Sequence, residues 1–242
     1  MFEFIHNIRY PKSKKKACHL ILMEFSGYYQ RLNENMQRIF VLRTLYFLKQ
    51  INFHSSKEIM LNFEIKVMVA SGFIQITFGL ARYSLIHFKS IYIAHKSYVY
   101  ESIGIPYHGD TNPQTARINL VWSVVKKGFL IPDDALNLSI HEFSHALILD
   151  NRERMRFRKI YRHRDFMRYL LAAKQEMNQM REGGESIFRK YAATNLMEFF
   201  AVSVEAFFEQ TDRFAIDQPL LFERLCILLK QDPRKSENPR IN

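Results

Sequence analysis

Hydrophobic positions in the first third of the chain recur about every 3.6 residues, a spacing typical of amphipathic helices. Residues 25–50 follow this pattern and predict one or two helices. A second apolar segment, residues 57–81, predicts a buried helix in which Gly72 marks a point of close packing, with Ser55 or Ser56 as its N-terminal cap. These elements predict a helical scaffold.

Two shorter segments, residues 90–93 and 117–122, predict strands. Both are rich in β-branched or aromatic residues and are bounded by polar loops. An exposed loop, residues 106–113, is expected between them.

Residues 135–149 are strongly periodic and predict another helix. The preceding residues Pro132, Asp133 and Asp134 are typical of a helix N-terminus. Apolar residues surround almost the whole helix, so we expect it to be buried. Its main apolar stripe consists of Leu136, Ile140, Phe143 and Leu147.

This predicted helix carries the sequence HEFSH, which starts at His141. Residues four apart on an α-helix are about 40° apart around the axis and about 6 Å apart along it, so His141 and His145 can both point at one metal ion. Zinc binds neutral imidazole nitrogen and, in catalytic sites, keeps one position open for water. Glu142 lies beside the pair and can take a proton from that water, as in the HExxH motif. Two buried histidines without a partner would be costly, which favours a metal over a structural role.

A catalytic zinc site needs a third protein ligand, and residues 195–210 offer two carboxylates. Glu198 and Glu205 lie on one face of a predicted apolar helix, where an acidic side chain needs a partner. Glu198 also fits a capping box with Asn195, in which the carboxylate would bond to its own helix end. From these residues alone, both roles of Glu198 stay open.

The composition predicts a folded protein with a large core, since 48% of the 242 residues are hydrophobic. We expect a basic N-terminal tail at residues 1–20 and a single domain at 21–242, helical at 21–89 and with the strands and catalytic helices at 90–242. The longest apolar run, residues 67–80, is too short and interrupted for a transmembrane span. Two cysteines provide no disulfide framework, which fits a reducing compartment, so a cytoplasmic location is expected.

The net charge of +11 permits contact with nucleic acid or an anionic membrane surface but is weak evidence for either. The lysines of residues 12–16 are expected in a solvated tail, with weak membrane-surface contact as the alternative. Residues 152–168 interleave arginines with aromatic side chains, a pattern that suits a nucleic-acid groove or an amphipathic helix with a solvated basic face. The helix is the favoured interpretation, so nucleic acid is not the expected partner.

Five segments spread over most of the chain carry a resemblance to a known family. They are QITFGL at 75–80, INLVW at 118–122, NLSIHEFSHAL at 137–147, YAATNLMEFFAVSVEAFFE at 191–209 and QDP at 231–233. Together they resemble the glucose-regulated zinc metallopeptidases typified by Mlc titration factor A, a family that is itself similar around the site to the anthrax lethal factor catalytic domain. This combination is far more specific than HExxH alone.

The resemblance assigns roles to individual residues. It implies that His141 and His145 bind zinc, that Glu142 is the general base and that Glu198 is the third ligand. Glu205 would then support a ligand from behind or serve the structure.

The family pattern also includes Tyr191, whose phenol could donate a hydrogen bond to the oxyanion of a tetrahedral intermediate. Without the resemblance, Tyr191 would be assigned to packing. His108, in the predicted exposed loop, could approach the site, but a surface or structural role is favoured.

We therefore expect an α+β, mostly helical domain of the zincin type, gluzincin-like, with a small sheet beside the HExxH helix. The predicted function is hydrolysis of peptide bonds through a zinc-bound water, with aminopeptidase-like action implied by the resemblance. Metallopeptidases commonly bind a peptide as an added strand on a sheet edge; one of the two predicted strands could be that edge, unless both are internal. The alternatives are a regulatory protein that sequesters a transcriptional regulator and a nucleic-acid binder that uses residues 152–168.

Overall fold

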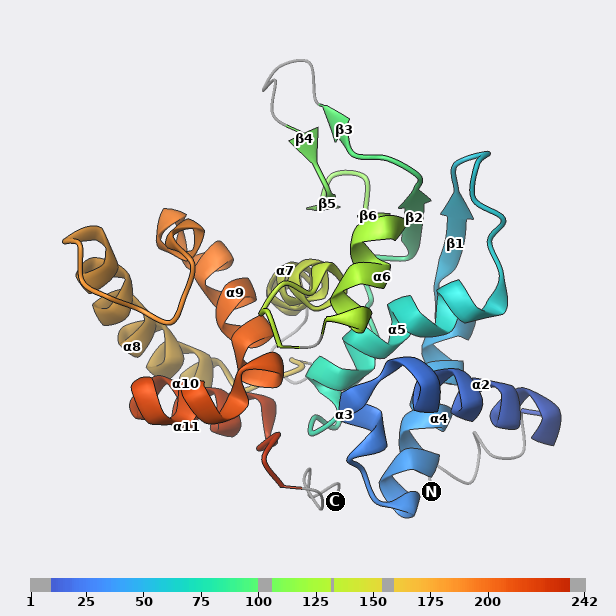
Figure 1. Cartoon of the computed structure of the whole chain (residues 1–242), viewed down its shortest axis with the longest axis horizontal. Helices are drawn as coiled ribbons and strands as arrows, with labels where there is room; N and C mark the ends of the chain where they lie inside the picture. Colours follow the sequence, from blue (N-terminus) through green and yellow to red (C-terminus); the bar gives the residue numbers. More distant parts are fainter. Residues whose placement is uncertain (1–9, 100–105, 132, 154–158, 236–242) are drawn as a thin grey trace.

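The computed structural model describes residues 10–99, 106–131, 133–153 and 159–235. The fold is mostly helical with a small mixed sheet, as predicted (Figure 1). The helices are α2 (Lys12–Phe25), α3 (Gly27–Gln30), α4 (Glu34–Gln50), α5 (Phe63–Thr77), α6 (Trp122–Leu130), α7 (Leu138–Glu153), α8 (His163–Arg181), the 3-10 helix η2 (Lys190–Thr194), α9 (Leu196–Glu209), α10 (Thr211–Asp217) and α11 (Pro219–Leu229). The strands are β1 (Asn52–Ser55), β2 (Ser90–Ala94), β3 (Tyr98–Val99), β4 (Pro106–Tyr107), β5 (Gly109–Asn112) and β6 (Arg117–Val121).

The N-terminal scaffold is helical, as predicted, but some of its elements differ. α3 and α4 occupy the segment that predicts one or two helices, and the side chain of Asn33 caps α4. The helix predicted over residues 57–81 is shorter in the structure, so both predicted ends are wrong. α5 begins after its cap, Asn62, and ends at Thr77. Ser55 is instead the last residue of β1, a strand that interrupts the part predicted to be helical.

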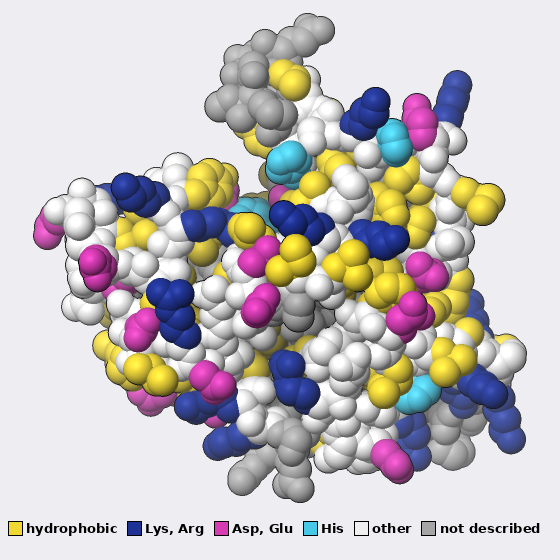
Figure 2. All heavy atoms as spheres, in the orientation of Figure 1, with side chains coloured by type: hydrophobic (Ala, Val, Ile, Leu, Met, Phe, Trp, Pro, Cys, Tyr) yellow, Lys and Arg dark blue, Asp and Glu magenta, His cyan; other side chains and the backbone are white. Residues whose placement is uncertain are grey.

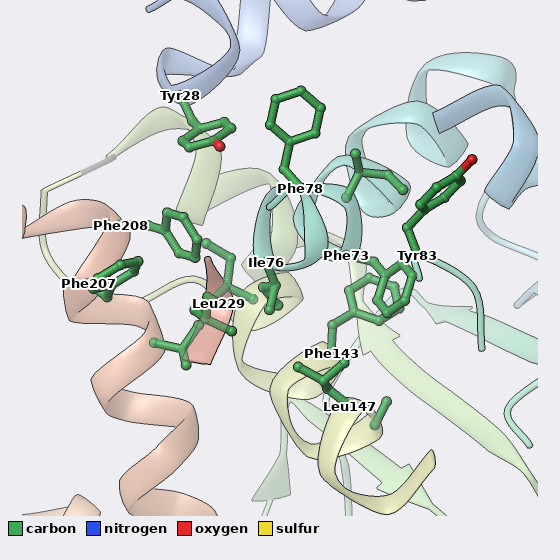
Figure 3. Packing of buried hydrophobic residues seen from close by; sticks show 14 of the residues in the cluster. Tyr28, Phe73, Ile76, Phe78, Tyr83, Phe143, Leu147, Phe207, Phe208 and Leu229 are labelled. Carbon is green, nitrogen blue, oxygen red and sulfur yellow. The ribbon is translucent and has the colours of Figure 1, made fainter. Parts of the chain in front are cut away.

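α5 is the central helix of the core, and most of its side chains are buried. Phe73 stacks on Phe47 of α4, with ring centroids 4.7 Å apart. The ring centroid of Phe73 also lies 5.4 Å from that of Phe143 of α7 (Figure 3). A Cβ atom at Gly72 would lie 2.7 Å from Oγ of Ser139, so the close packing predicted at this glycine is confirmed. These contacts seat α7, the helix that carries HExxH, on the scaffold.

The main sheet has the strand order β1-β2-β6-β5. β1, β2 and β6 are parallel, and β5 is antiparallel to β6. The strands predicted at 90–93 and 117–122 are confirmed as β2 and β6, but both are internal, so neither is a sheet edge. The prediction of a loop over residues 106–113 is wrong, because β4 and β5 lie there. Within the described chain, β5 is an edge strand and lies beside α7.

The register of β5 turns two of its residues toward α7. Thr111 pairs with Ile118 and Gly109 pairs with Leu120, and these two β6 side chains are fully buried. Because side chains alternate along a strand, Thr111 and Gly109 share the face that packs on the helices. This edge strand therefore helps to build the site.

The predicted HExxH helix is confirmed, but α7 begins three residues later and ends four residues later than expected. Ala135 has a φ of 55°, in the left-handed region, which prevents the helix from starting earlier. The cap is Asn137, whose side chain accepts the N–H of Ile140. Leu136 therefore lies outside the helix and is 47% exposed, and Pro132 lies outside the described residues.

Two of the family-like segments, QITFGL and QDP, contact each other. Nε2 of Gln231 donates to the main-chain oxygens of Gln75 and Ile76, at 2.9 Å each, and the hydroxyl of Tyr28 donates to Gln231 at 2.7 Å. These bonds satisfy carbonyl groups at the C-terminal end of α5. Both segments therefore serve the scaffold.

The basic residues 12–16 are largely exposed, as expected of a solvated segment, but they begin a helix. α2 buries Cys18 and Leu22 against the core. The division into a tail of residues 1–20 and a domain of residues 21–242 remains a prediction.

The basic stretch 152–168 is not one amphipathic helix. Arg152 belongs to the end of α7, α8 starts at His163, and the buried residues Ile160 and Tyr161 lie between them. Residues 154–158, with three of the arginines, lie outside the described chain. On the face shown in Figure 2, Lys and Arg side chains are dispersed among acidic, apolar and uncharged ones. Within the described part of the chain, no helix has the length and apolar character needed to cross a membrane.

Candidate metal centre

Two helices bring three metal-ligating side chains to one point. His141 and His145 project from α7, and Glu198 projects from the first turn of α9. Oε2 of Glu198 lies 3.2 Å from Nε2 of His141 and 3.5 Å from Nε2 of His145. The two Nε2 atoms are 3.1 Å apart. Among the described side chains, these three form the one group able to hold a metal ion.

The three separations fit a single ion. A tetrahedral ion such as zinc, with ligands at about 2.0 to 2.2 Å, places its ligand atoms about 3.3 to 3.6 Å apart. The observed triangle, with sides of 3.1, 3.2 and 3.5 Å, is close to one face of such a tetrahedron. Two imidazoles and one carboxylate suit a transition metal better than calcium or magnesium, which prefer oxygen ligands. The residues therefore fit a metal ion with an open fourth position.

The carboxylate of Glu198 lies at the histidines, and it is the main-chain N–H of Glu198 that takes part in the helix cap. Its main-chain N–H donates to the side chain of Asn195 at 3.0 Å, so Asn195 caps α9. Its carboxylate points to the two histidines. The asparagine cap starts the helix and leaves the carboxylate available to a metal.

Glu205 holds His141 from behind. Nδ1 of His141 lies 2.6 Å from Oε1 of Glu205, so a proton on Nδ1 leaves Nε2 as the metal-facing atom. Arg189 donates to the same oxygen at 2.7 Å, and the main-chain N–H of Asn137 donates to Oε2 at 2.8 Å. A carboxylate in this position orients the imidazole and makes it a better ligand.

Arg189 and Asn137 are site residues that the sequence pattern does not single out. Arg189 also donates to the main-chain oxygen of Ala135 at 2.8 Å, so it ties the start of the α7 region to the segment before α9. The sequence points to Arg189 only indirectly. Glu205 lies in a predicted apolar helix, and a glutamate that is buried, as Glu205 is, needs a cation as partner.

The charges around His141 favour a cation at this point. Burial by itself would lower the pKa of His141, but the carboxylates of Glu205 and Glu198 outweigh it and raise the pKa to about 10. The pKa of Glu198 moves the other way: burial would raise it, but the bonds to both histidines hold it far below its usual range. The same atoms can therefore stabilise either a proton or a metal ion.

Glu142 is buried, and its carboxylate lies against β5. Its Oε2 accepts a hydrogen bond from the Thr111 hydroxyl at 2.9 Å. A Cβ atom at Gly109 would lie 2.9 Å from Oε1, so the carboxylate occupies the space that a side chain there would fill. Burial raises the pKa of Glu142, although the neighbouring histidines and Thr111 lower it. A carboxylate with a raised pKa is suited to taking and returning a proton.

Comparison with known proteins shows the family of the chain. The model of the glucose-regulated metallo-peptidase M90 family matches residues 7–229. The chain belongs to this metallopeptidase family. The family expected from the sequence is therefore confirmed.

Two relatives illustrate the range of similarity within this metallopeptidase family. An uncharacterized protein of Synechocystis sp. is 22% identical over 220 residues, which are 85% of this chain and 80% of the relative. Mlc titration factor A of Salmonella schwarzengrund is 33% identical over 135 residues, which are 53% of this chain and 49% of that protein. The chain thus matches about half the length of Mlc titration factor A.

Tyr191 lies in η2, just before α9, and is 53% exposed. Partial burial, followed by the negative charge of Glu198, raises the pKa of Tyr191 to about 12. The phenol therefore stays protonated at neutral pH. The phenol lies close enough to Glu198 and Glu142 for their charges to act on it.

His108 lies between β4 and β5, and its side chain is exposed. Its Nδ1 is 2.8 Å from Oγ of Ser97, and its main-chain oxygen accepts the N–H of Val121. These contacts give His108 a surface and structural position, as the sequence favours.

Proposed function

We propose that the chain is a zinc peptidase of the zincin type, gluzincin-like, which hydrolyses peptide bonds. The observation that carries this proposal is the triangle of donor atoms from His141, His145 and Glu198, with the Glu142 carboxylate beside it. Zinc held by these residues would lower the pKa of a water molecule and polarise the scissile carbonyl.

The side chains around the triangle divide the remaining work. Glu142 takes a proton from the attacking water and returns it to the leaving amine. Tyr191 donates its hydroxyl proton in a hydrogen bond to the oxyanion of the tetrahedral intermediate. Glu205 holds His141 in the orientation that presents Nε2 to the ion.

The edge strand β5 is the proposed place for the substrate backbone. Its outer edge has no partner strand among the described residues, and its inner face holds Glu142 through Thr111. A peptide added along this edge would gain main-chain hydrogen bonds next to the general base. Aminopeptidase-like action, which the resemblance implies, is part of the proposal; peptides with a free N-terminus should then be cleaved faster than their acetylated forms.

Replacement of Glu142 by glutamine tests the mechanism. The variant should bind zinc as wild type does, while peptide turnover falls by about a hundredfold or more, because the proton acceptor is lost. Glu153→Gln, at the exposed end of the same helix, is the matched control and should leave turnover unchanged. Unchanged turnover in Glu142→Gln would contradict the assignment.

A regulatory role is the second candidate, and the relatives called Mlc titration factor A support it. A protein that acts by binding a transcriptional regulator does not need the general base. Glu142→Gln would then keep the regulatory partner while losing hydrolysis, whereas an enzyme without this role would capture no such partner.

We place the protein in the cytoplasm. Cys18 and Cys226 are both unpaired, and Cys18 is buried. Free thiols of this kind suit a reducing compartment.

A further inference from the structure

A groove opens where the histidine face of α7 ends. Ile148 and Arg152 follow His145 by three and seven residues, so they lie about 60° and 20° from it around the helix and about 5 and 10 Å further along the axis. Leu196 and Met197, which directly precede the proposed ligand on α9, also line the groove. The groove therefore begins on the two helices that form the candidate metal centre.

The inside of this groove is apolar. Its volume is about 1270 Å³, and side chains from α7, α8, α9, α11 and the segments between them line it. Buried aliphatic and aromatic groups form the floor, among them Leu80, Ile148, Ile160, Tyr161 and Leu228. Met167 stands at the rim and is 43% exposed. An occupant must therefore bring apolar groups of its own.

The rim of the groove is basic. Arg152 comes from the end of α7, Arg162 and Arg164 from the start of α8, and Lys230 from the residue after α11. All four side chains are exposed. Of the described residues that line the groove, Asp165 alone is acidic, and its carboxylate is mostly buried, 3.8 Å from Nε of Arg164. An occupant must therefore also bring negative charge.

Size and charge distribution favour a peptide over a fatty acid. Pockets for small ligands usually measure about 300 to 1000 Å³, so this groove can take several side chains. The four cations named above come from three separate parts of the fold. A single fatty-acid carboxylate would meet one of them, whereas acidic side chains spaced along a peptide can meet several.

We propose that this groove docks an acidic and apolar segment of the peptide substrate, adjacent to the part that enters the metal centre. This inference rests on the proposed peptidase function, because it names the substrate class of that site. The apolar side chains of the segment cover the floor, and its carboxylates pair with the arginines of the rim. Substrate choice is then set beyond the metal centre, at the end of α7.

Binding can be measured separately from hydrolysis with the zinc-loaded Glu142→Gln protein. The probe is a fluorescein-labelled peptide that alternates Leu and Phe with Glu, compared with the same peptide carrying Gln in place of Glu. At low ionic strength we expect the Glu peptide to bind at least about tenfold more tightly. Equal binding of the two peptides would overturn the proposal.

Charge reversal then locates the binding. The double variant Arg162→Glu/Arg164→Glu, made in the Glu142→Gln background, should bind the Glu peptide about tenfold or more weakly. Circular dichroism checks that this variant is folded. Arg152→Glu, on a different helix, is the second variant if the first does not fold. Lys12→Glu/Lys16→Glu on α2 is the control with the same change in net charge. An equal loss in this control would show non-specific attraction and overturn the site.

Hydrolysis by the otherwise wild-type enzyme tests the substrate role. The Glu peptide should have a lower KM than the Gln peptide, and Arg162→Glu/Arg164→Glu should raise that KM with little change in kcat. If the Glu peptide binds in the groove but is cleaved no better than the Gln peptide, the groove does not select substrate. If neither peptide is cleaved, nor any other peptide, the peptidase function fails, while the binding measurement still reports on the groove.

Discussion

The hydroxyl of Thr111 lies 2.9 Å from both the main-chain oxygen and Oε2 of Glu142. This contact joins the edge strand β5 to the helix that carries the proposed general base. It also limits where the carboxylate can point. The base is therefore positioned by the sheet as well as by its own helix.

Thr111→Val should lower kcat by about tenfold, because the isosteric side chain keeps the packing but cannot bond to the carboxylate. The zinc content should stay at the wild-type value, since no ligand is touched. Thr111→Ser, which keeps the hydroxyl, should restore most of the activity. Steady-state kinetics with metal analysis checks all three, and full activity in the valine variant would show that Thr111 has no positioning role.

Gly109→Ala should also reduce turnover, by about tenfold or more, through a steric effect on the same carboxylate. The added Cβ would lie 2.9 Å from Oε1 of Glu142 and 2.8 Å from Cδ1 of Leu138, both at the ends of flexible side chains. We therefore expect the protein to fold and the carboxylate to move. Gly27→Ala is the matched control, since the atom closest to its added Cβ lies 3.8 Å away. Loss of activity without loss of melting temperature is the expected result, and unchanged kcat would contradict it.

Glu205→Gln should weaken zinc binding by about 10- to 100-fold. The change removes the negative charge behind His141 and leaves Arg189 with a weaker partner. Competition with a chromophoric chelator measures the affinity. Glu223→Gln, on an exposed part of α11, should bind zinc as wild type does. Equal affinity of the two variants would mean that Glu205 serves only the structure.

Glu209 should make the protein less stable as the pH rises. Burial raises the pKa of Glu209 to about 8; the bond from Asn137 opposes the rise, while Glu205 adds to it. The folded state therefore holds more protons than the unfolded state between the ordinary carboxyl pKa of 4.5 and about 8. The free energy of unfolding falls as the pH rises through this range, and the full penalty is present above pH 8.

Glu209→Gln removes the charge and keeps an oxygen that can accept the bond from Asn137. We expect it to raise the free energy of unfolding by about 1 to 3 kcal/mol at pH 8 and by little at pH 4. Urea unfolding at both values, with wild type alongside, measures the difference. A stabilisation that does not change with pH would contradict the titration of Glu209.

The elements with strong periodicity could be predicted from the sequence, and the elements made by tertiary pairing could not. The helical spacing around His141 predicts α7, and a buried glutamate seven residues from another directs attention to α9. β5 has the composition of a turn, Gly-Asp-Thr-Asn, and becomes a strand because β6 supplies its hydrogen bonds. The sequence therefore could not predict that Thr111 and Gly109 lie beside Glu142.

The same limit explains the remaining differences. The cap of α7 is Asn137 because Ala135 adopts a left-handed φ, a local conformation that the apolar pattern does not reveal. Arg189 stands outside any motif, and only the folded chain shows that it meets Glu205. The choice of Glu198 over Glu205 as the third ligand follows from the family resemblance and not from periodicity.

The bonds from His141, Asn137 and Arg189 to Glu205 join α7, α9 and the segment before α9 through protein atoms alone. The two helices thus keep their relative positions whether or not an ion is present. Removal of the metal should then extinguish catalysis and leave the fold intact, unlike in a zinc finger, where the ion and the fold are lost together. The supply of the ion, rather than the amount of folded protein, would determine how many molecules are active.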